Sequence, residues 1–414
     1  MDWLLSLPTY ILLFATLYFE VFLIYTYIED KTSFSHKKLS KRLPGGYPSV
    51  TILVPAWNEE KTLSNTITSL LSLEYPKNKL SLFIINDGST DGTLAVANSF
   101  ADNPQVTVFT KENGGKHTAM NLGISHANSE LIGCLDADSF VEKNALKEIV
   151  EVFRMGNDIM AVTPSVQIHF PTNWLQKIQS IEYMMGQFMR KVLSRIHGLY
   201  VTPGPFSFYR KEVFERIGGF KHAYGTEDME MAMRMQKNHM RIENAHSALV
   251  HTVSPRTIPT LYKQRVRWVS GFLKNAFYDY RHMFLNKKYG DFGFLVFPFG
   301  LVSIFSALFF STQYIRLIGT ALYNRYIEYS VLGFHFSLPS LEWFSFNLEF
   351  QRLIIYLLVV VTLLFIVIGM LMVKRKLFLS SGLIYFVFLY GLIAPFWLAK
   401  SVYNLVLGQN ARWR

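Results

Sequence analysis

Residues 131–140 read LIGCLDADSF, a run of small and apolar residues that ends on two aspartates, Asp136 and Asp138. A short apolar run bounded by polar residues is typical of a buried strand. Side chains at positions i and i+2 of a strand point to the same side, so we expect two negative charges close together. Such a pair repels itself unless a cation lies between the carboxylates.

The pattern of a strand followed by polar residues occurs three more times upstream. Apolar runs at 49–55, 80–85 and 106–110 predict strands, and the segments 61–73, 90–100 and 118–125 predict helices. Alternating strands and helices predict an α/β domain whose parallel sheet carries helices on both faces. Ligands of such sheets bind beyond the carboxyl ends of the strands.

Polar clusters follow each predicted strand: WNEE at 57–60, NDGS at 86–89, NGGK at 113–116, and the two aspartates. Singly, each has an ordinary explanation, because an acidic WNEE suits a helix start, an Asp-Gly pair suits a turn, and two glycines can reverse the chain. Together, at four converging strand ends, they favour a nucleotide site. The chain contains no GxGxxG and no GxxxxGK[ST], which disfavours a dinucleotide or a P-loop triphosphate.

Four long apolar stretches predict membrane helices. They lie at 3–28, 292–313, 353–373 and 377–399, in a chain of 414 residues with a mean hydropathy of +0.20. Each is long enough to cross a bilayer, which takes about 20 residues. The first is interrupted only by Glu20 and has no basic leader, so it resembles a retained anchor more than a cleaved signal peptide.

The net charge of +11 is concentrated beside these stretches, at 31–42 and 374–376. Basic residues next to membrane helices favour the cytoplasmic side, so we expect the N-terminus outside and residues 30–290 inside. A basic face against anionic lipid is a better explanation of the charge than nucleic-acid binding, and we expect no nucleic-acid partner. The single cysteine, Cys134, falls in an apolar strand and is expected to be a small buried hydrophobe in a reducing compartment.

The aspartate pair suits a hard divalent cation, Mg²⁺ or Mn²⁺, which takes one or two carboxylates and fills its other positions with water and phosphate. Two further stretches bear on this interpretation: GTEDME at 225–230 and QRVRW at 264–268. Acids at 227 and 228 also suit a helix start on dipole grounds alone. The basic and aromatic segment around QRVRW also suits an amphipathic helix at a membrane surface.

The chain contains five motifs in the order DGS at 87–89, GGK at 114–116, DAD at 136–138, TED at 226–228 and QRVRW at 264–268. In these five motifs and in their order, the chain resembles the family 2 glycosyltransferases. More narrowly, the chain resembles the processive membrane polysaccharide synthases that make poly-N-acetylglucosamine, chitin, hyaluronan and cellulose. The motifs cover about residues 48–275. The resemblance implies a GT-A-like nucleotide-sugar domain inserted between transmembrane helices, with interfacial helices at 174–191 and 259–283.

The resemblance also implies a role for each matching residue. On the donor side, Glu59 and Asp87 would contact uridine, Lys116 the nucleotide, Asp136 the diphosphate and its metal, and Asp138 the metal.

On the acceptor side, Asp228 would be the general base, Gln264 and Arg267 would cap the diphosphate, and Trp268 would stack on the acceptor sugar. Glu227 would lie at the acceptor, and Gly204 falls in the segment 201–210, which takes the place of the family's acceptor loop. The chemistry fits these residue types, because direct displacement at an anomeric carbon needs a carboxylate base and cations at the departing diphosphate. No covalent nucleophile is required.

The chain has neither the FxVTxK gating loop of cellulose synthases nor a long C-terminal domain for a cyclic dinucleotide. It therefore most resembles bacterial poly-N-acetylglucosamine synthases in layout. We expect an N-terminal transmembrane helix at 1–30, a cytoplasmic GT-A domain at 31–255, interfacial helices with QxxRW at 256–290, and about three transmembrane helices in 291–414. The segment 314–352 could hold another membrane or interfacial element.

The expected function is an inverting, metal-dependent transfer of N-acetylglucosamine from a UDP-sugar to a growing β-linked polysaccharide, coupled to export. Two alternatives stay open: a single-transfer enzyme that modifies a membrane lipid, and an inactive membrane-anchored binding protein. The expected location is the plasma (inner) membrane, with several passes. The expected partners are the donor, the acceptor and membrane lipid, and the sequence leaves an accessory subunit open. Residues 377–407 either bend back at Pro395 as a re-entrant pair or export the basic tail at 411–414.

Overall fold

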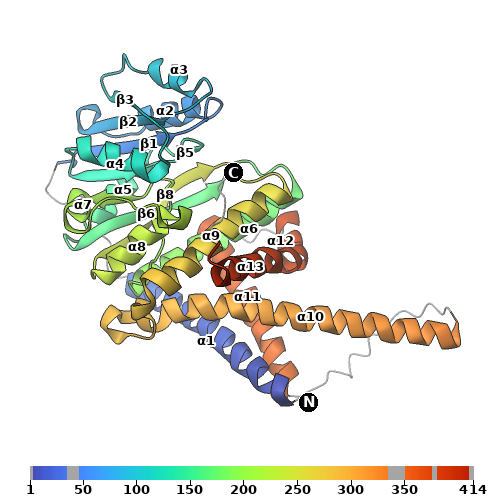
Figure 1. Cartoon of the computed structure of the whole chain (residues 1–414). Helices are drawn as coiled ribbons and strands as arrows, with labels where there is room; N and C mark the ends of the chain where they lie inside the picture. Colours follow the sequence, from blue (N-terminus) through green and yellow to red (C-terminus); the bar gives the residue numbers. More distant parts are fainter. Residues whose placement is uncertain (1–2, 35–45, 334–349, 375–379, 410–414) are drawn as a thin grey trace.

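The computed structural model describes residues 3–34, 46–333, 350–374 and 380–409. A single mixed sheet with helices on both faces lies at one end, and long apolar helices lie at the other (Figure 1). The eight strands are β1 Val50–Ala56, β2 Leu80–Asp87, β3 Val106–Lys111, β4 Leu131–Cys134, β5 Ser139–Val141, β6 Ile159–Ile168, β7 Phe208–Arg210 and β8 Arg241–Thr252.

The sheet has the order β3-β2-β1-β4-β7-β6-β8-β5. Strands β3, β2, β1 and β4 are parallel, which confirms the four strands expected from the sequence. The second half is mixed, because β7 pairs antiparallel with both β4 and β6, and β5 pairs antiparallel with β8. Gly133 permits the β4–β7 contact, since a Cβ there would lie 2.3 Å from the Phe208 ring.

The shorter helices that pack on the sheet are α2 Leu63–Leu71, α3 Thr93–Asn98, α4 Lys116–His126, α5 Ala145–Phe153, α7 Lys211–Ile217 and α8 Glu227–Lys237. Each expected helix forms, with shorter ends for the first two. Helix α5, which was not expected from the sequence, is amphipathic: its buried residues recur every three to four positions and form one apolar face toward the sheet.

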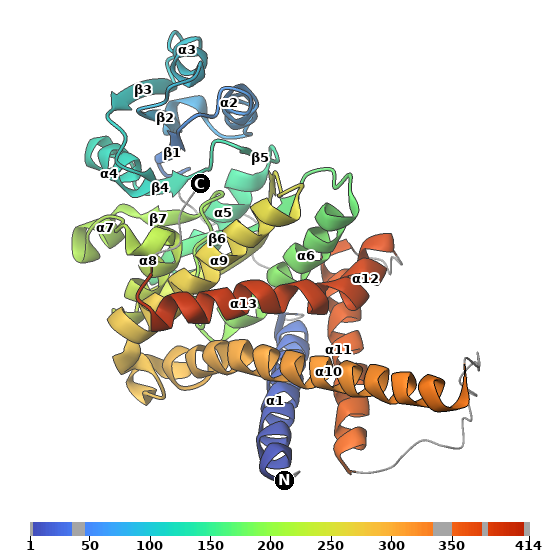
Figure 2. The ribbon, with the colours of Figure 1, turned by 45° about the vertical axis from the view of Figure 1, so that its right-hand side comes forward.

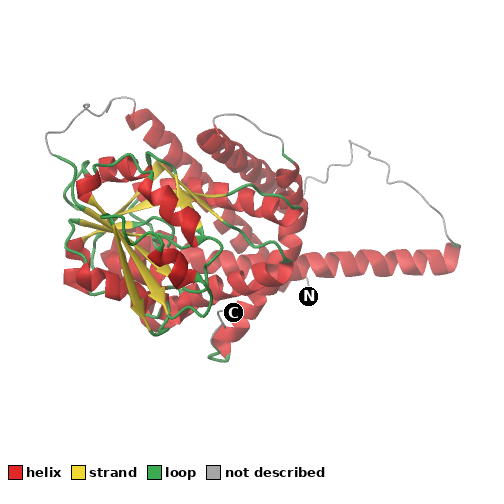
Figure 3. Cartoon of the chain, turned by 90° about the horizontal axis from the view of Figure 1, so that it is seen from above, coloured by secondary structure: helices red, strands yellow, loops and turns green. Residues whose placement is uncertain are grey.

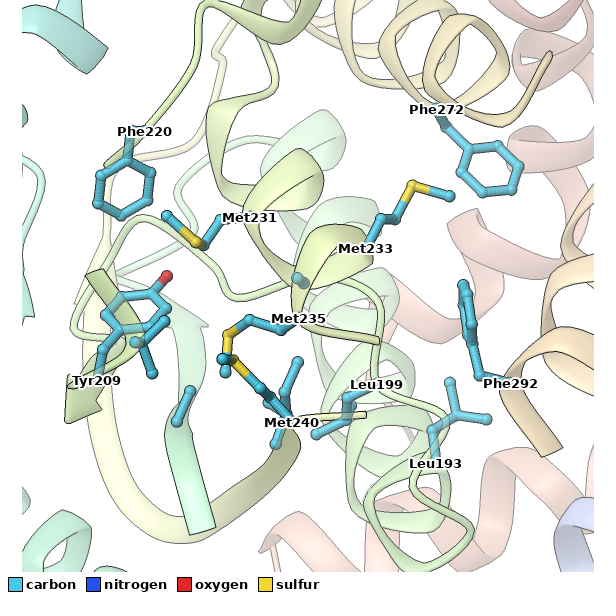
Figure 4. Packing of buried hydrophobic residues seen from close by; sticks show 14 of the residues in the cluster. Leu193, Leu199, Tyr209, Phe220, Met231, Met233, Met235, Met240, Phe272 and Phe292 are labelled. Carbon is cyan, nitrogen blue, oxygen red and sulfur yellow. The ribbon is translucent and has the colours of Figure 1, made fainter. Parts of the chain in front are cut away.

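Helix α8 lies within the main hydrophobic core (Figure 4). Met231 points toward Phe220 and Tyr209 of the sheet domain, Met235 lies beside Met240, and Met233 faces Phe272 (Figure 4). The same core continues into the long apolar helices, where it includes buried phenylalanines and leucines such as Phe19, Leu23 and Phe297. The sheet domain and these helices therefore share one core rather than being joined by a linker alone.

Two amphipathic helices, α6 Trp174–Arg195 and α9 Ile258–Lys274, lie between the sheet and the apolar helices (Figures 1 and 2). Asn173 caps α6 by accepting a hydrogen bond from the Gln176 backbone N–H at 2.8 Å, and Thr257 caps α9. Helix α6 packs on α11 Phe350–Lys374 and α12 Ser381–Tyr385, and α9 packs on α13 Gly391–Val406. Helix α6 forms over the expected segment 174–191 and α9 over the first part of 259–283, and their place at a membrane surface stays a prediction.

Among the residues described, four helices are long and apolar enough to cross a membrane: Leu7–Glu29, Phe292–Leu332, Leu353–Val373 and Ser381–Val406. The first belongs to α1 Trp3–Phe34, and the second includes α10 Phe297–Leu332. Helices α1 and α11 run side by side, while α10 and α13 cross them (Figures 1 and 2). The outer end of α10 projects away from the rest of the protein (Figure 3).

Within the described residues, three of these candidate helices follow the sheet domain, and the expectation that about three helices in 291–414 cross the membrane stays a prediction. Helix 381–406 is continuous through Pro395, with a π-helical turn at 386–390, so the re-entrant pair is wrong. The basic tail at 411–414, residues 375–376 of the second basic cluster and most of the first, at 35–42, lie outside the described residues. So does 334–349, in which a further membrane segment was considered.

Candidate active site

The aspartates of DAD lie in a turn rather than in a strand, which corrects the sequence interpretation. Strand β4 ends at Cys134, and the Ser139 N–H donates to the Asp136 carbonyl at 3.0 Å. The two carboxyl groups nevertheless lie close together. Burial, followed by the negative charges of Asp136 and Glu59, raises the pKa of Asp138 to about 7. Three acids from two strand ends therefore meet at one edge of the sheet.

Lys116, the first residue of α4, joins a motif expected at the donor to one expected at the acceptor. Its Nζ lies 2.5 Å from Asp136 Oδ1 and 3.2 Å from Glu227 Oε1. Burial opposes the charged form, but these two carboxylates hold the pKa of Lys116 well above its usual value. Gly204 packs directly on this pair, because a Cβ there would lie 2.5 Å from Lys116 Nζ and 2.9 Å from Asp136 Oδ2. The structure thus brings GGK, DAD, TED and the 201–210 segment together.

Asp87 is buried and holds the glycine turn that precedes Lys116. Its Oδ1 accepts from the Gly114 N–H at 3.1 Å, and its Oδ2 accepts from the Gly115 N–H at 2.9 Å. Lys111 adds an ion pair to Oδ1 at 2.7 Å. Gly115 has a φ of +88°, which explains why glycine stands at this position. The role of Asp87 visible here is to shape the turn, and its contact with uridine stays a prediction.

Glu227 and Asp228 begin α8, as the acidic start of that helix suggested. Burial and the neighbouring charge of Glu227 raise the pKa of Asp228 to about 6. Burial favours a raised pKa for Glu227 as well, but the positive charge of Lys116 outweighs burial, so the Glu227 pKa is lowered. The Thr202 hydroxyl donates to the Asp228 carbonyl at 2.8 Å, so the 201–210 segment is fastened to the acid pair.

Helix α9 brings Arg267 of QxxRW to the same region. Arg267 Nη1 donates to the Gly225 carbonyl at 2.9 Å and lowers the pKa of Asp228 by its charge. Gln264 and Trp268 lie on the same helix, and both contact the side chain of Arg265. The residues of GGK, DAD and TED therefore gather at one edge of the sheet together with Arg267, and the approach of Gln264 and Trp268 to them stays a prediction.

Sequence reasoning missed three residues that support the site: Lys111 beside Asp87, Thr202 beside Asp228, and Arg265 inside QRVRW. A lysine just before NGGK and an arginine inside a basic helix are compatible with solvent exposure, so no sequence signal separated them from surface charges. In the described part of the chain, no group of three or more His, Cys, Asp or Glu residues is arranged to hold a metal. The carboxylate pair of Asp136 and Asp138 remains the candidate position for a metal ion.

Comparisons with known proteins agree with this geometry. The profile of the family described as "Glycosyltransferase like family 2" matches residues 48–271. A poly-beta-1,6-N-acetyl-D-glucosamine synthase of Staphylococcus epidermidis is 28% identical over 345 residues, which is 83% of this chain and 81% of that protein. A synthase of the same name from Staphylococcus aureus is 31% identical over 262 residues, or 62% of this chain and 63% of that protein.

A solved mannosyltransferase from Pyrobaculum calidifontis, in complex with GDP-Man and Mn²⁺, has a similar fold. Its TM-score is 0.63 at 16% identity, and the match covers 97% of this chain and 99% of that one. The likeness therefore extends from the sheet domain to the apolar helices and confirms the GT-A-like fold. With its motifs gathered in one site and its family profile covering more than half of its length, this chain belongs to the family 2 glycosyltransferases.

Proposed function

We propose that the protein is a membrane-bound, inverting N-acetylglucosaminyltransferase that extends a β-linked polysaccharide from a UDP-sugar. The observation that carries this proposal is the Lys116 bridge, because it joins a donor-side acid, Asp136, to the acid pair expected at the acceptor. The identity of the sugar follows the names of the two staphylococcal relatives.

The chemistry assigns a task to each charged side chain. The acceptor hydroxyl attacks the anomeric carbon as the bond to the diphosphate breaks, and Asp228 takes the hydroxyl proton. With a pKa of about 6, Asp228 is ionised at neutral pH but remains a better base than an exposed aspartate. Arg267 suits the leaving diphosphate, because its planar fork pairs with phosphate oxygens. Lys116 places a second positive charge between the carboxylates of Asp136 and Glu227.

The residues present fit a divalent cation. Asp138 is crowded by the charges of Asp136 and Glu59, and a cation beside its carboxylate would relieve this repulsion. Lys116 already neutralises one oxygen of Asp136, so Asp138 is the main ligand we expect. Mg²⁺ or Mn²⁺ would neutralise the charge that develops on the diphosphate. The mannosyltransferase with a similar fold contains Mn²⁺.

A growing polymer must leave the cytoplasmic side, and the apolar helices share a core with the catalytic domain, which favours export through this region. A single transfer to a membrane lipid is the second candidate. It is favoured by α6 and α9, which would bring the site close to the bilayer. We expect no nucleic-acid partner, and an accessory subunit remains open.

Product size separates the two candidates. Membranes carrying the protein are incubated with radiolabelled UDP-N-acetylglucosamine and Mn²⁺, then extracted with solvent and resolved on a gel. Parallel incubations use UDP-glucose and UDP-glucuronate, and the Asp228→Asn variant serves as the inactive control. A high-mass smear that a matching glycosidase degrades supports the polymer. Label that partitions entirely with lipid as a monosaccharide supports single transfer, and no UDP release from any donor leaves only the binding-protein alternative.

A further inference from the structure

Arg265, the second residue of QRVRW, is buried in α9 with its side chain 3% exposed. Its guanidinium contacts both neighbouring motif residues. Nη1 donates to Gln264 Oε1 at 3.1 Å, and the guanidinium carbon lies 4.3 Å from the centre of the Trp268 ring. One side chain outside the implied catalytic set therefore touches two residues inside it.

These contacts determine how the motif residues face the site. A guanidinium has only donors, so Gln264 must turn its oxygen toward Arg265 and its NH₂ group away. That NH₂ group is the donor that a diphosphate oxygen requires. The guanidinium also covers one face of the Trp268 indole, which leaves the opposite face for a sugar ring.

Arg265 is anchored on the amphipathic helix α6 and, through it, on an apolar helix. Its Nη2 lies 2.7 Å from Glu182 Oε2, and Glu182 Oε1 accepts from the Tyr390 hydroxyl at 3.1 Å. Tyr390 lies on the π-helical turn between α12 and α13. Burial opposes the charged form of Arg265, but Glu182 holds its pKa above the usual value, so the guanidinium stays ionised.

We propose that Arg265 is a positioning residue for the glycosyl transfer, which turns the Gln264 amide donors toward the diphosphate and holds Trp268 with one face free for the acceptor. Glu182 and Tyr390 fix this arrangement against the helices beneath the sheet domain. The proposal rests on the proposed function, since it assigns Gln264 and Trp268 to that reaction.

A role in stability alone makes a different prediction. Replacing a buried ion pair by apolar side chains of similar size is often neutral or stabilising, whereas removing one partner is costly. The double variant Arg265→Met/Glu182→Leu therefore separates the two roles. If Arg265 only stabilises the fold, this variant folds and is active. If Arg265 positions the motif, the variant folds and is inactive.

The experiment measures UDP release from UDP-N-acetylglucosamine by the purified full-length protein in nanodiscs. We expect kcat/KM to fall about 10²-fold in Arg265→Met and in the double variant, because small misplacements of catalytic groups have effects of this order. Arg265→Lys keeps the positive charge but cannot contact Gln264 and Trp268 at the same time as Glu182. We therefore expect its kcat/KM to lie between those of Arg265→Met and the wild-type protein. Adding Arg265→Met to a Trp268→Leu variant should cost less than it does in the wild-type protein, since contacting residues are coupled, and the loss that remains reports on Gln264.

Arg154→Met is the matched control. The Arg154 guanidinium also combines an aromatic contact with an ion pair, because its carbon lies 5.3 Å from the centre of the Tyr47 ring and its Nη1 lies 2.8 Å from Glu151 Oε1. Arg154 belongs to none of the site segments, so kcat/KM should stay near wild type in the folded protein. A folded double variant with near wild-type activity, or multiplicative effects of Arg265→Met and Trp268→Leu, overturns the proposal.

Tryptophan emission tests the arrangement without catalysis. Arg265→Met should shift the emission of the protein, and the shift should disappear when Trp268 is replaced by Phe. If the wild-type protein releases no UDP but this pattern holds, the proposed function fails while the positioning contact stands. If Arg265→Met leaves the emission unchanged, the positioning contact itself is wrong.

Discussion

Glu227 and Asp228 are neighbours in the chain, yet their carboxyl pKa values move in opposite directions. Lys116 stabilises the charge of Glu227, whereas burial and the charge of Glu227 itself raise the pKa of Asp228. When neighbouring acids are separated in this way, the one with the raised pKa is the candidate base. The motif alone does not show this division, because both residues are simply acids at a helix start.

The pH profile of the reaction tests this division. Asp228 must be ionised to accept a proton, so kcat/KM for the acceptor should fall as the pH decreases through about 6. Glu227→Gln removes a negative neighbour, lowers the Asp228 pKa, and should move this limb to lower pH. Rates at saturating Mn²⁺ are measured from about pH 5 to 8. Glu142→Gln, an exposed acid paired with His251, is the control and should leave the limb in place.

Gly204 is expected to matter for activity more than for folding. In Gly204→Ala the new Cβ would displace the Lys116 amine, which is the flexible end of a long side chain, and break the pair with Asp136. We expect loss of most UDP release, with a change of less than about 1 kcal/mol in the free energy of unfolding. Gly46→Ala, with nothing within 4 Å of the new Cβ, is the control. An active Gly204→Ala protein would show that this pair is dispensable.

At the scale of elements, α1 and α11 are joined by a polar contact in apolar surroundings. Thr362 donates to both oxygens of Glu20, at 3.0 and 3.1 Å. Glu20 interrupts the otherwise uncharged stretch at 3–28, and a carboxyl in such a position is retained only when it finds a partner. The contact explains how this residue is tolerated in a helix that we expect to cross a membrane.

Thr362→Val keeps the shape of the side chain and removes the donor to Glu20. We expect destabilisation of about 0.6–2 kcal/mol, the range for hydrogen bonds between membrane helices, measured by thermal unfolding in nanodiscs. Thr320→Val is the matched control, because Thr320 is exposed and donates only to the Arg316 carbonyl within its own helix, at 2.9 Å. Equal effects of the two substitutions would remove any special role for the contact.

At the scale of the whole molecule, the shared core makes the catalytic domain and the apolar helices one unit, and the side of the membrane on which that unit lies can be measured. Cys134 is the only cysteine, and it is buried with a thiol pKa raised to about 12 by that burial, so it should not react. A cysteine introduced at the exposed Ser99 is therefore the one thiol that we expect to react with a maleimide. We expect an impermeant maleimide to label Ser99→Cys in inverted vesicles and not in intact cells, since basic residues favour the cytoplasm. Labelling of Ser99→Cys in intact cells would show that the sheet domain lies on the outer side of the membrane.

The sequence by itself determined the four parallel strands, the polar residues at their ends, the long apolar helices and the family. These features depend on local periodicity and on motifs of adjacent residues, which can be read along the chain. Only the tertiary structure decided that β7 enters the sheet antiparallel between β4 and β6 and that the aspartates lie in a turn. It also decided the bridges from Lys116 to Glu227 and from Arg265 to Glu182. These contacts join residues far apart in the chain, so burial and packing select them, and no local pattern distinguishes such side chains from solvated surface charges.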